Sequence, residues 1–406
     1  YQEVSNMNNI RKLTDSLFWV GVNDRRIALF ENVYPVPTGM SYNSYVLLDE
    51  KTALFDTVDA SFTHDFLENV TAALKGRTLD YLIVNHMEPD HCASIADVIA
   101  VYPEAKIVCT AKAVGMMKQF FDFDMDSRAI PVKEGDTISL GSHELTFVMA
   151  PMVHWPEVMV TYEKTEKILF SADAFGSFGA VDGNIFADEI DDKVAWLSEA
   201  RRYYTNIVGK FGMSVQGLLK KAAGLEIRMI CPLHSVIWRE DLPWLIDKYL
   251  KWSSYTPEEK SVTIAYGSVY GHTEKAADIL AGKLADRGIR HISVFDVSKT
   301  HPSYIIADAF RTSAIVFASI TYNGGIFCNM DTLLHQLAAH GLTNRTAALI
   351  QNGTWAATTS KQMGEILGTM KNIHVLESDV TIKSALKDNQ EAELDALADA
   401  IAASLQ

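Results

Sequence analysis

The stretch His86-Met87-Glu88-Pro89-Asp90-His91 decides how this sequence is interpreted. It directly follows the apolar run Tyr81–Asn85 (YLIVN), which predicts a buried strand. Two imidazoles and two carboxylates within six residues would perturb one another's pKa values unless a cation neutralised them. The alternative, a solvated charged loop, gives these residue types no reason to gather. The stretch therefore predicts a metal site at the carboxyl end of a strand.

Three more ligand-type residues stand at the ends of strand-like runs later in the chain. They are His154, Asp173 and His234. A rigid sheet can aim side chains that stand at its strand ends. Each of the three, taken alone, is more often a cap or turn residue, but their order after the first motif indicates a common centre. The candidate metal ligands are His86, Glu88, Asp90, His91, His154, Asp173 and His234.

Length and composition exclude several classes of protein. The 406 residues suggest two or three domains, and 48% hydrophobic with 21% charged residues is ordinary for globular chains. A net charge of -15 argues against binding nucleic acid or an anionic membrane. We find no apolar run long enough to span a membrane and no leader-like start. The four cysteines form no C-x-x-C pair, which fits a reducing cytoplasm.

The chain divides near the polar segment KWSSYTPEEK (residues 251–260). We expect one domain at residues 1–253, a linker at 254–260 and a second domain at 261–406. The first half carries closely spaced strand-like runs, which predict a mixed α/β sandwich with many antiparallel strands. The second half alternates five strand-like runs with helical patterns, which predicts a doubly wound parallel sheet.

The first turn of the second domain carries a phosphate-binding pattern. It comprises Ser268, Val269, Tyr270, Gly271, His272 and Thr273. The hydroxyls of Ser268 and Thr273, with Gly271 between them, can surround a phosphate at a helix N-terminus, where backbone N–H groups and the helix dipole favour an anion. The loop lacks both the lysine of nucleoside-triphosphatase loops and the pattern G-x-G-x-x-G. It is similar to the flavodoxin motif [ST]-x-x-G-x-T, although a plain structural turn is the alternative.

Two further loops are expected at the same edge of that sheet. One comprises Ser319, Ile320, Thr321, Tyr322, Asn323, Gly324 and Gly325, and the other comprises Asn352, Gly353, Thr354, Trp355 and Ala356. Flavodoxin-like folds bind FMN at the carboxyl ends of their strands. Both loops offer glycine for close approach and an aromatic ring able to lie against an isoalloxazine, with ordinary packing as the alternative for each ring. The three loops together predict FMN binding.

The order of the metal ligands resembles the metallo-β-lactamase-like fold, whose motif H-x-H-x-D-H precedes a distant His, Asp and His. Here Glu88 stands at the second motif position. A carboxylate in place of an imidazole adds charge and hardness, which favours iron over zinc. With the flavodoxin-like half, the chain resembles the flavodiiron proteins over nearly its whole length. The resemblance implies a metallo-β-lactamase-like αββα sandwich followed by a flavodoxin-like doubly wound parallel sheet, with FMN and two irons per chain.

The same resemblance assigns the ligands to two irons. One iron would take His86, Glu88 and His154. The other would take Asp90, His91 and His234, and Asp173 would bridge the two. In this family a tyrosine often stands near the substrate, and Tyr203 and Tyr204 are both candidates, with packing as the alternative for each. Trp155 is a possible pocket wall.

The resemblance also implies the activity and partners. Flavodiiron proteins reduce O2 to water, NO to N2O, or both, and they form head-to-tail homodimers or dimers of dimers. The chain ends without a C-x-x-C knuckle, so we expect a separate electron donor such as rubredoxin, and we expect the protein to be cytoplasmic. Two alternatives stay open: a zinc-dependent hydrolase fused to a flavodoxin module, and a flavodoxin-type electron carrier with a structural metal site.

Overall fold

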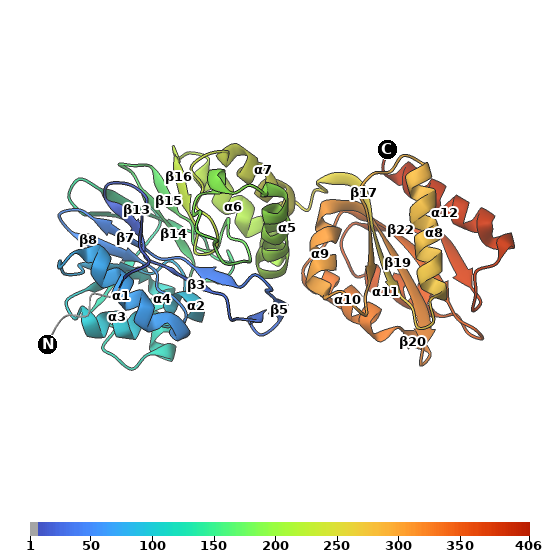
Figure 1. Ribbon diagram of the computed structural model, residues 1–406, viewed down its shortest axis with the longest axis horizontal. Helices are drawn as coiled ribbons and strands as arrows, with labels where there is room; N and C mark the ends of the chain where they lie inside the picture. The colour runs from blue at the N-terminus through green and yellow to red at the C-terminus, as the bar shows by residue number, and fades with distance from the viewer. Residues whose placement is uncertain (1–6) are drawn as a thin grey trace. The chain divides into compact units, whose positions relative to one another are not determined.

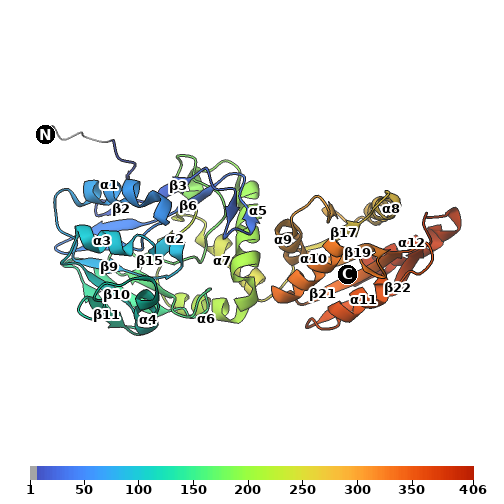
Figure 2. The ribbon, with the colours of Figure 1, turned by 90° about the horizontal axis from the view of Figure 1, so that it is seen from below.

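The computed structural model describes residues 7–406, which form two compact units (Figures 1 and 2). The first unit contains the described residues up to Tyr203 together with Met213–Tyr249. The second contains Tyr204–Gly212 and Leu250–Gln406. The first strand of the second unit, β17, begins at Glu259, inside the segment expected to be a linker.

The first unit is built on two sheets. The seven-stranded sheet has the order β1 (Arg11–Lys12), β2 (Leu17–Trp19), β7 (Tyr45–Leu48), β8 (Thr52–Phe55), β9 (Tyr81–Ile83), β10 (Lys106–Thr110) and β11 (Ala129–Val132). The five-stranded sheet has the order β12 (Thr137–Ser139), β13 (Glu144–Met149), β14 (Met159–Glu163), β15 (Ile168–Phe170) and β16 (Met229–Cys231). Strands β8 to β11 run parallel, as do β15 and β16, while the other pairs are antiparallel.

Helices cover the outer faces of this sandwich. On the side of the seven-stranded sheet are α1 (Thr63–Leu74), α3 (Ile95–Val101) and α4 (Ala111–Phe120) (Figure 1). On the side of the five-stranded sheet are α5 (Lys193–Tyr203), α6 (Gly212–Ala222) and α7 (Leu242–Ser253). The core between the sheets is apolar, and the stacked rings of Phe55 and Phe170 join the two layers at a centroid distance of 3.7 Å. This arrangement confirms the predicted αββα sandwich.

Two small two-stranded sheets complete the first unit. Strand β3 (Val22–Asp24) pairs with β6 (Met40–Tyr42), and β4 (Leu29–Phe30) pairs with β5 (Tyr34–Pro35). Glu31 and Asn32 both have positive φ in the tight turn between β4 and β5, and Val33 N–H donates to the carbonyl of Phe30. Positive φ at both central residues of this turn matches the twist of the two strands that it joins.

The second unit is a single parallel sheet with one added strand. Its order is β18 (Ile292–Asp296), β17 (Glu259–Gly267), β19 (Thr312–Tyr322), β21 (Arg345–Asn352) and β22 (Ile373–Ile382), and β20 (Gly325–Ile326) pairs antiparallel with β19. Helices α8 (His272–Asp286) and α12 (Glu391–Ser404) pack on one face. Helices α9 (Pro302–Arg311), α10 (Cys328–Ala339) and α11 (Thr359–Leu367) pack on the other. This strand order is that of flavodoxin and confirms the predicted doubly wound sheet.

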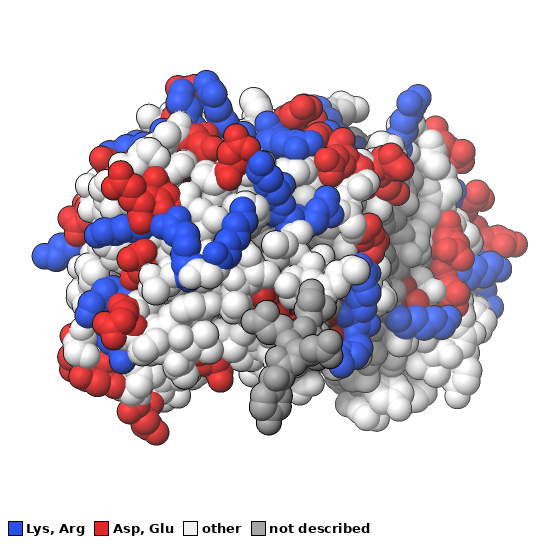
Figure 3. Space-filling model, turned by 60° about the vertical axis from the view of Figure 1, so that its left-hand side comes forward, with Lys and Arg blue, Asp and Glu red and all other residues white. Residues whose placement is uncertain are grey.

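The surface is charged and mixed. On the face shown in Figure 3, Lys and Arg side chains are interspersed with Asp and Glu. Ion pairs such as that of Lys164 with Glu144 form between partly exposed side chains. Across residues 7–406, none of the helices combines the length and apolar character needed to cross a membrane.

Candidate metal centre and flavin site

The seven predicted ligands meet at one edge of the sandwich. The loop after β9 and the short helix α2 (Pro89–Cys92) carry four of them, the loop between β13 and β14 carries His154, and the turns after β15 and β16 carry Asp173 and His234. All seven residues are buried. Their possible ligand atoms fall into two groups, each within 4.8 Å, namely His86, Glu88, His154 and Asp173, and Asp90, His91 and His234.

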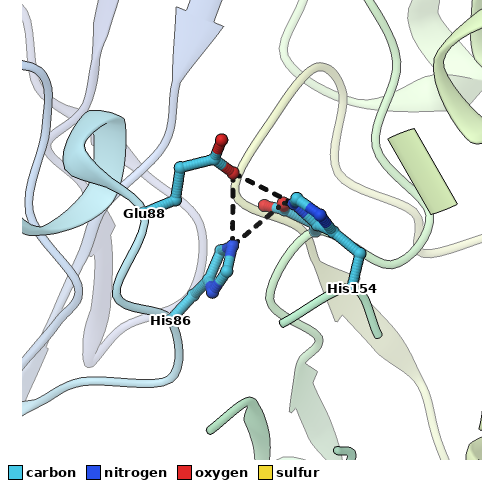
Figure 4. Close-up of side chains that lie close together, drawn as sticks. His86, Glu88 and His154 are labelled. Carbon is cyan, nitrogen blue, oxygen red and sulfur yellow. Dashed lines mark hydrogen bonds and ion pairs between the residues drawn. The ribbon is translucent and has the colours of Figure 1, made fainter. Parts of the chain in front are cut away.

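In the first group the side chains converge on the carboxylate of Glu88 (Figure 4). Its Oε2 lies 3.3 Å from His86 Nε2 and 3.0 Å from His154 Nε2. In the second group the Nε2 atoms of His91 and His234 lie only 3.0 Å apart, and Oδ2 of Asp90 lies 3.3 Å from each of them. In both groups the Nε2 atoms of the imidazoles face carboxylate oxygens.

Asp173 joins the two groups. Its Oδ2 lies 3.1 Å from His154 Nε2 and 3.4 Å from His86 Nε2. Its Oδ1 faces the other group, 3.2 Å from His91 Nε2 and 3.8 Å from His234 Nε2. One carboxylate therefore presents one oxygen to each group, which is the geometry expected of a bridging ligand.

Two contacts that the sequence analysis missed orient the imidazoles. Oε1 of Glu157 accepts hydrogen bonds from His86 Nδ1 and from the Met87 N–H, both at 2.9 Å. The carbonyl of Ser41 accepts a hydrogen bond from His234 Nδ1 at 2.7 Å. Such contacts determine which ring nitrogen carries the proton, so that Nε2 of each ring is left to bind a metal.

The charges of the centre depend on one another. Burial opposes protonation of the imidazoles, yet the surrounding carboxylates, Asp173 above all, raise the pKa values of His86 and His154, that of His154 to about 9. Burial also opposes ionisation of Glu88 and Asp173, but the histidines hold the pKa values of these carboxylates below their usual range. A metal cation supplies the same positive charge without protons.

The donor set fits a pair of iron ions. It comprises four imidazoles and three carboxylates, a mixture harder than an all-histidine zinc site. Within the described chain, the carboxylate oxygens of Asp90 and Asp173 are buried and accept no hydrogen bond. Buried oxygens of this kind are costly unless a cation or donor satisfies them.

The two candidate tyrosines have different surroundings. The ring of Tyr203 packs edge-on to His234 at 5.4 Å, whereas that of Tyr204 packs against Trp252 at 5.3 Å. The structure thus brings Tyr203 to the ligands and not Tyr204. Burial raises the pKa of Tyr203 well above its usual value, so its hydroxyl stays protonated. In the described part of the chain that buried hydroxyl makes no hydrogen bond.

Aromatic and acidic side chains border the centre. Trp155 packs edge-on to His86 at 5.4 Å, and Phe30 packs edge-on to His234 at 5.6 Å. Glu31, at the tip of the β4–β5 hairpin, is solvent-accessible, yet partial loss of hydration and the nearby carboxylate of Glu88 raise its pKa to about 8. The sequence analysis missed Glu31, because a hairpin residue remote in sequence gives no sign of which site it overhangs.

The three predicted flavin loops lie at one edge of the second unit. Strands β17, β19 and β21 are parallel and in register, with Gly267 opposite Ser319 and Ile320 opposite Asn352. Gly271 caps α8 with a φ of +88°, a conformation that favours glycine. The Gly271 N–H donates to Ser268 Oγ at 3.1 Å, which folds the first loop around the start of the helix.

The second of these loops differs from its prediction. Residues Ser319–Tyr322 belong to β19, and Asn323 and Gly324, both with positive φ, form the tight turn to β20. The continuous apolar run of this strand stopped before Ser319, so the sequence did not indicate that hairpin pairing with β20 would extend the strand. The loops are connected, because Thr358 N–H donates to Thr321 Oγ1 at 3.2 Å.

The residues of this edge fit FMN. Large aromatic side chains stand in solvent here, with Trp355 92%, Tyr270 90% and Tyr322 48% exposed. Exposed aromatic rings at a sheet edge offer flat apolar surface to an isoalloxazine ring. The start of the fifteen-residue helix α8 offers N–H groups and a favourable dipole to a phosphate.

Comparisons with known proteins agree with this geometry. A family model described as ODP family beta lactamase matches residues 40–235, which include all seven candidate ligands. The anaerobic nitric oxide reductase flavorubredoxin of Aeromonas hydrophila is 31% identical over 347 residues, which is 84% of this chain and 69% of that protein. The chain belongs to the flavodiiron protein family.

Solved structures of flavodiiron proteins match the whole fold. Rubredoxin oxygen:oxidoreductase from Desulfovibrio gigas has a TM-score of 0.90 at 28% identity, and the flavodiiron protein of Giardia intestinalis has a TM-score of 0.92 at 25% identity. Each comparison covers 98% of this chain and 98% of the other chain. These likenesses confirm the predicted family, and they do not favour the hydrolase or the electron-carrier alternative.

Proposed function

We propose that this flavodiiron protein reduces O2 to water, NO to N2O, or both, using FMN and two non-haem irons. The observation that carries the proposal is the position of Asp173, whose Oδ1 and Oδ2 face different groups of ligands at 3.2 Å and 3.1 Å. A carboxylate shared in this way would offer one oxygen to a metal ion in each group of ligands.

The side chains of the centre have distinct roles in this proposal. His86, Glu88 and His154 would hold one iron, and Asp90, His91 and His234 would hold the other. Glu157 and the Ser41 carbonyl accept hydrogen bonds from Nδ1 of His86 and of His234, which would leave each Nε2 able to bind iron. Tyr203 keeps its phenolic proton and serves as a hydrogen-bond donor beside the ligands.

The two cofactors supply electrons in the numbers that the reactions need. Two ferrous ions and a fully reduced FMN together hold four electrons, which with four protons convert O2 into two water molecules; two NO molecules require two electrons and two protons to give N2O and water. We further propose a cytoplasmic location, a separate rubredoxin-type electron donor, and a head-to-tail homodimer or dimer of such dimers, all from membership of the family.

Anaerobic stopped flow tests the activity. The protein, with its iron and FMN content measured, is chemically reduced and mixed separately with O2 and with NO. We expect rapid oxidation of flavin and iron by at least one gas, with water formed from O2 without peroxide, or N2O from NO. A His234→Ala variant is the control, because it is expected to lose one iron while retaining FMN.

The outcomes separate the possibilities. Oxidation by O2 alone marks an oxygen reductase, and oxidation by NO with release of N2O marks an NO reductase. Oxidation of the iron by neither gas faster than free reduced flavin reacts would overturn the proposal, as would wild-type rates in a variant that holds a single iron.

A further inference from the structure

The side-chain amide of Asn352, the last residue of β21, connects two loops of the flavin site. Its Oδ1 accepts a hydrogen bond from the Ser384 N–H at 3.1 Å. Its Nδ2 donates to the Ser384 carbonyl at 3.0 Å and to Thr273 Oγ1 at 3.3 Å. Asn352 is only 5% exposed, so its side chain faces these loops and not solvent.

Ser384 determines which way this amide points. A backbone N–H can only donate and a backbone carbonyl can only accept, so the two bonds to Ser384 require Oδ1 on one side and Nδ2 on the other. Ser384 itself has a φ of +69°, which turns both of its backbone groups toward Asn352. The atom that faces Thr273 is therefore the amide nitrogen, which is a donor only.

The contact leaves the Thr273 proton available. A hydroxyl has one proton to donate and two lone pairs that accept. The Asn352 Nδ2 occupies a lone pair of Thr273 Oγ1, and the hydroxyl proton can then be donated elsewhere. Thr273 is the second residue of α8 and fully buried, at a helix start suited to an anion.

We propose that Asn352 is a positioning residue that presents the Thr273 hydroxyl proton to the phosphate of FMN. It acts through Thr273 and not by touching the flavin ring. This inference rests on the proposed FMN site, and it gives Asn352 a role different from the direct cofactor contact that the sequence analysis expected.

Two substitutions distinguish this role from simple packing. Asn352→Ala removes the donor, whereas Asn352→Asp keeps the shape but places an acceptor opposite Thr273. The carboxylate of Asp would accept the hydrogen bond from the Thr273 hydroxyl in place of the phosphate, and its negative charge would repel the phosphate. If Asn352 only filled space, the nearly isosteric Asn352→Asp would be the milder change; if it orients Thr273, Asn352→Asp is the more harmful one.

The measurement is the affinity of the flavin-depleted 406-residue chain for FMN and for riboflavin, followed by quenching of flavin fluorescence. Riboflavin lacks the phosphate, so the ratio of the two dissociation constants reports the phosphate contact and cancels general damage to the loops. We expect Asn352→Ala to weaken the binding of FMN relative to that of riboflavin about fivefold, which is the effect of losing one neutral hydrogen bond. Asn352→Asp should weaken FMN binding relative to riboflavin binding by about 10- to 100-fold, the range for losing a hydrogen bond to a charged group.

A matched control and a double-mutant cycle complete the test. Gln351→Ala changes the adjacent strand residue, whose side chain donates to Thr381 Oγ1 and accepts from the Ser360 N–H, and among the described residues has no hydrogen bond to Thr273. It should leave the ratio unchanged. In a Thr273→Val background, Asn352→Ala should change the ratio no further, because its partner is gone.

Each result has one meaning. A wild-type chain that does not bind FMN would overturn the proposed function itself. A wild-type chain that prefers FMN, combined with an unchanged ratio in both Asn352 variants, would overturn only this inference. The inference would also fail if Asn352→Asp were milder than Asn352→Ala, or if the effects of Asn352→Ala and Thr273→Val were additive.

Discussion

Replacing Glu157 by glutamine tests whether the metal centre depends on a charge that touches no metal. Glu157 is 2% exposed, and its Oε1 accepts hydrogen bonds from His86 Nδ1 and the Met87 N–H, both at 2.9 Å. Gln can keep both bonds through its carbonyl oxygen, so the geometry is preserved. The substitution removes the negative charge of Glu157, which makes Nε2 of His86 a stronger metal ligand.

The expected loss is considerable for a residue outside the ligand set. Removing such an outer partner weakens metal binding about 10- to 100-fold, or about 1.4–2.7 kcal/mol. The amide nitrogen of Gln would also replace Oε2 of Glu157, which has no hydrogen-bond partner among residues 7–406. A buried donor without an acceptor costs about 1–3 kcal/mol of folding stability.

The assay is an anaerobic Fe(II) titration of metal-depleted protein, with thermal unfolding measured alongside. Glu163→Gln is the matched control, because Glu163 Oε1 lies 3.0 Å from His143 Nδ1 in a similarly buried pair outside the predicted centre. We expect Glu157→Gln to lower iron affinity and Glu163→Gln to leave it unchanged. Wild-type iron affinity in Glu157→Gln, or an equal loss in both variants, would refute the reasoning.

Three further perturbations have expected outcomes. Asp173→Asn removes one of the two carboxylate oxygens that face the two ligand groups. Elemental analysis of this variant should find at most one iron per chain. Two retained irons would contradict the bridging role of Asp173. Neighbouring carboxylates raise the pKa of His154 to about 9, so at neutral pH Fe(II) must displace a proton from this imidazole. The affinity for Fe(II), measured by titration at a series of pH values, should therefore rise with pH until about 9. An affinity that does not change with pH would contradict the raised pKa. Arg345 is buried and donates to five main-chain carbonyls, so Arg345→Met should lower the unfolding free energy of the second unit by about 3 kcal/mol or more with iron content unchanged. Chemical denaturation followed by flavin fluorescence measures this loss, and a change below about 1 kcal/mol would contradict it.

The ligand set was predictable because its residues lie at strand ends that the sequence marks clearly. The run Tyr81–Asn85 is apolar and stops at His86, so the strand and the first ligand are seen together. The doubly wound sheet was predictable for a similar reason, since its strands and helices alternate with different hydrophobic periods. In both cases the local sequence pattern was sufficient to predict the feature.

The partners of these ligands were not predictable, because they come from tertiary contacts. Glu157 follows Trp155-Pro156 in a loop and gives no sign that it reaches His86, 71 positions away in the chain. The Ser41 carbonyl has no side-chain signature at all, since every residue has a carbonyl. Tyr203 ends α5, and Tyr204 begins the π-helical turn that follows it, so only the packing of this segment decides which of the two meets His234.

The two cofactor sites differ in how they depend on the fold. Each metal group takes ligands from both sheets: the loop after β9 belongs to the seven-stranded sheet, whereas the residues that follow β13, β15 and β16 belong to the five-stranded sheet. Bound metal therefore joins the two layers of the sandwich, and its binding free energy adds to folding stability. The flavin loops, in contrast, all follow strands of one sheet whose faces are already covered by helices. Metal binding would consequently add to the cohesion that the apolar core gives the first unit, whereas the second offers FMN a largely preformed edge.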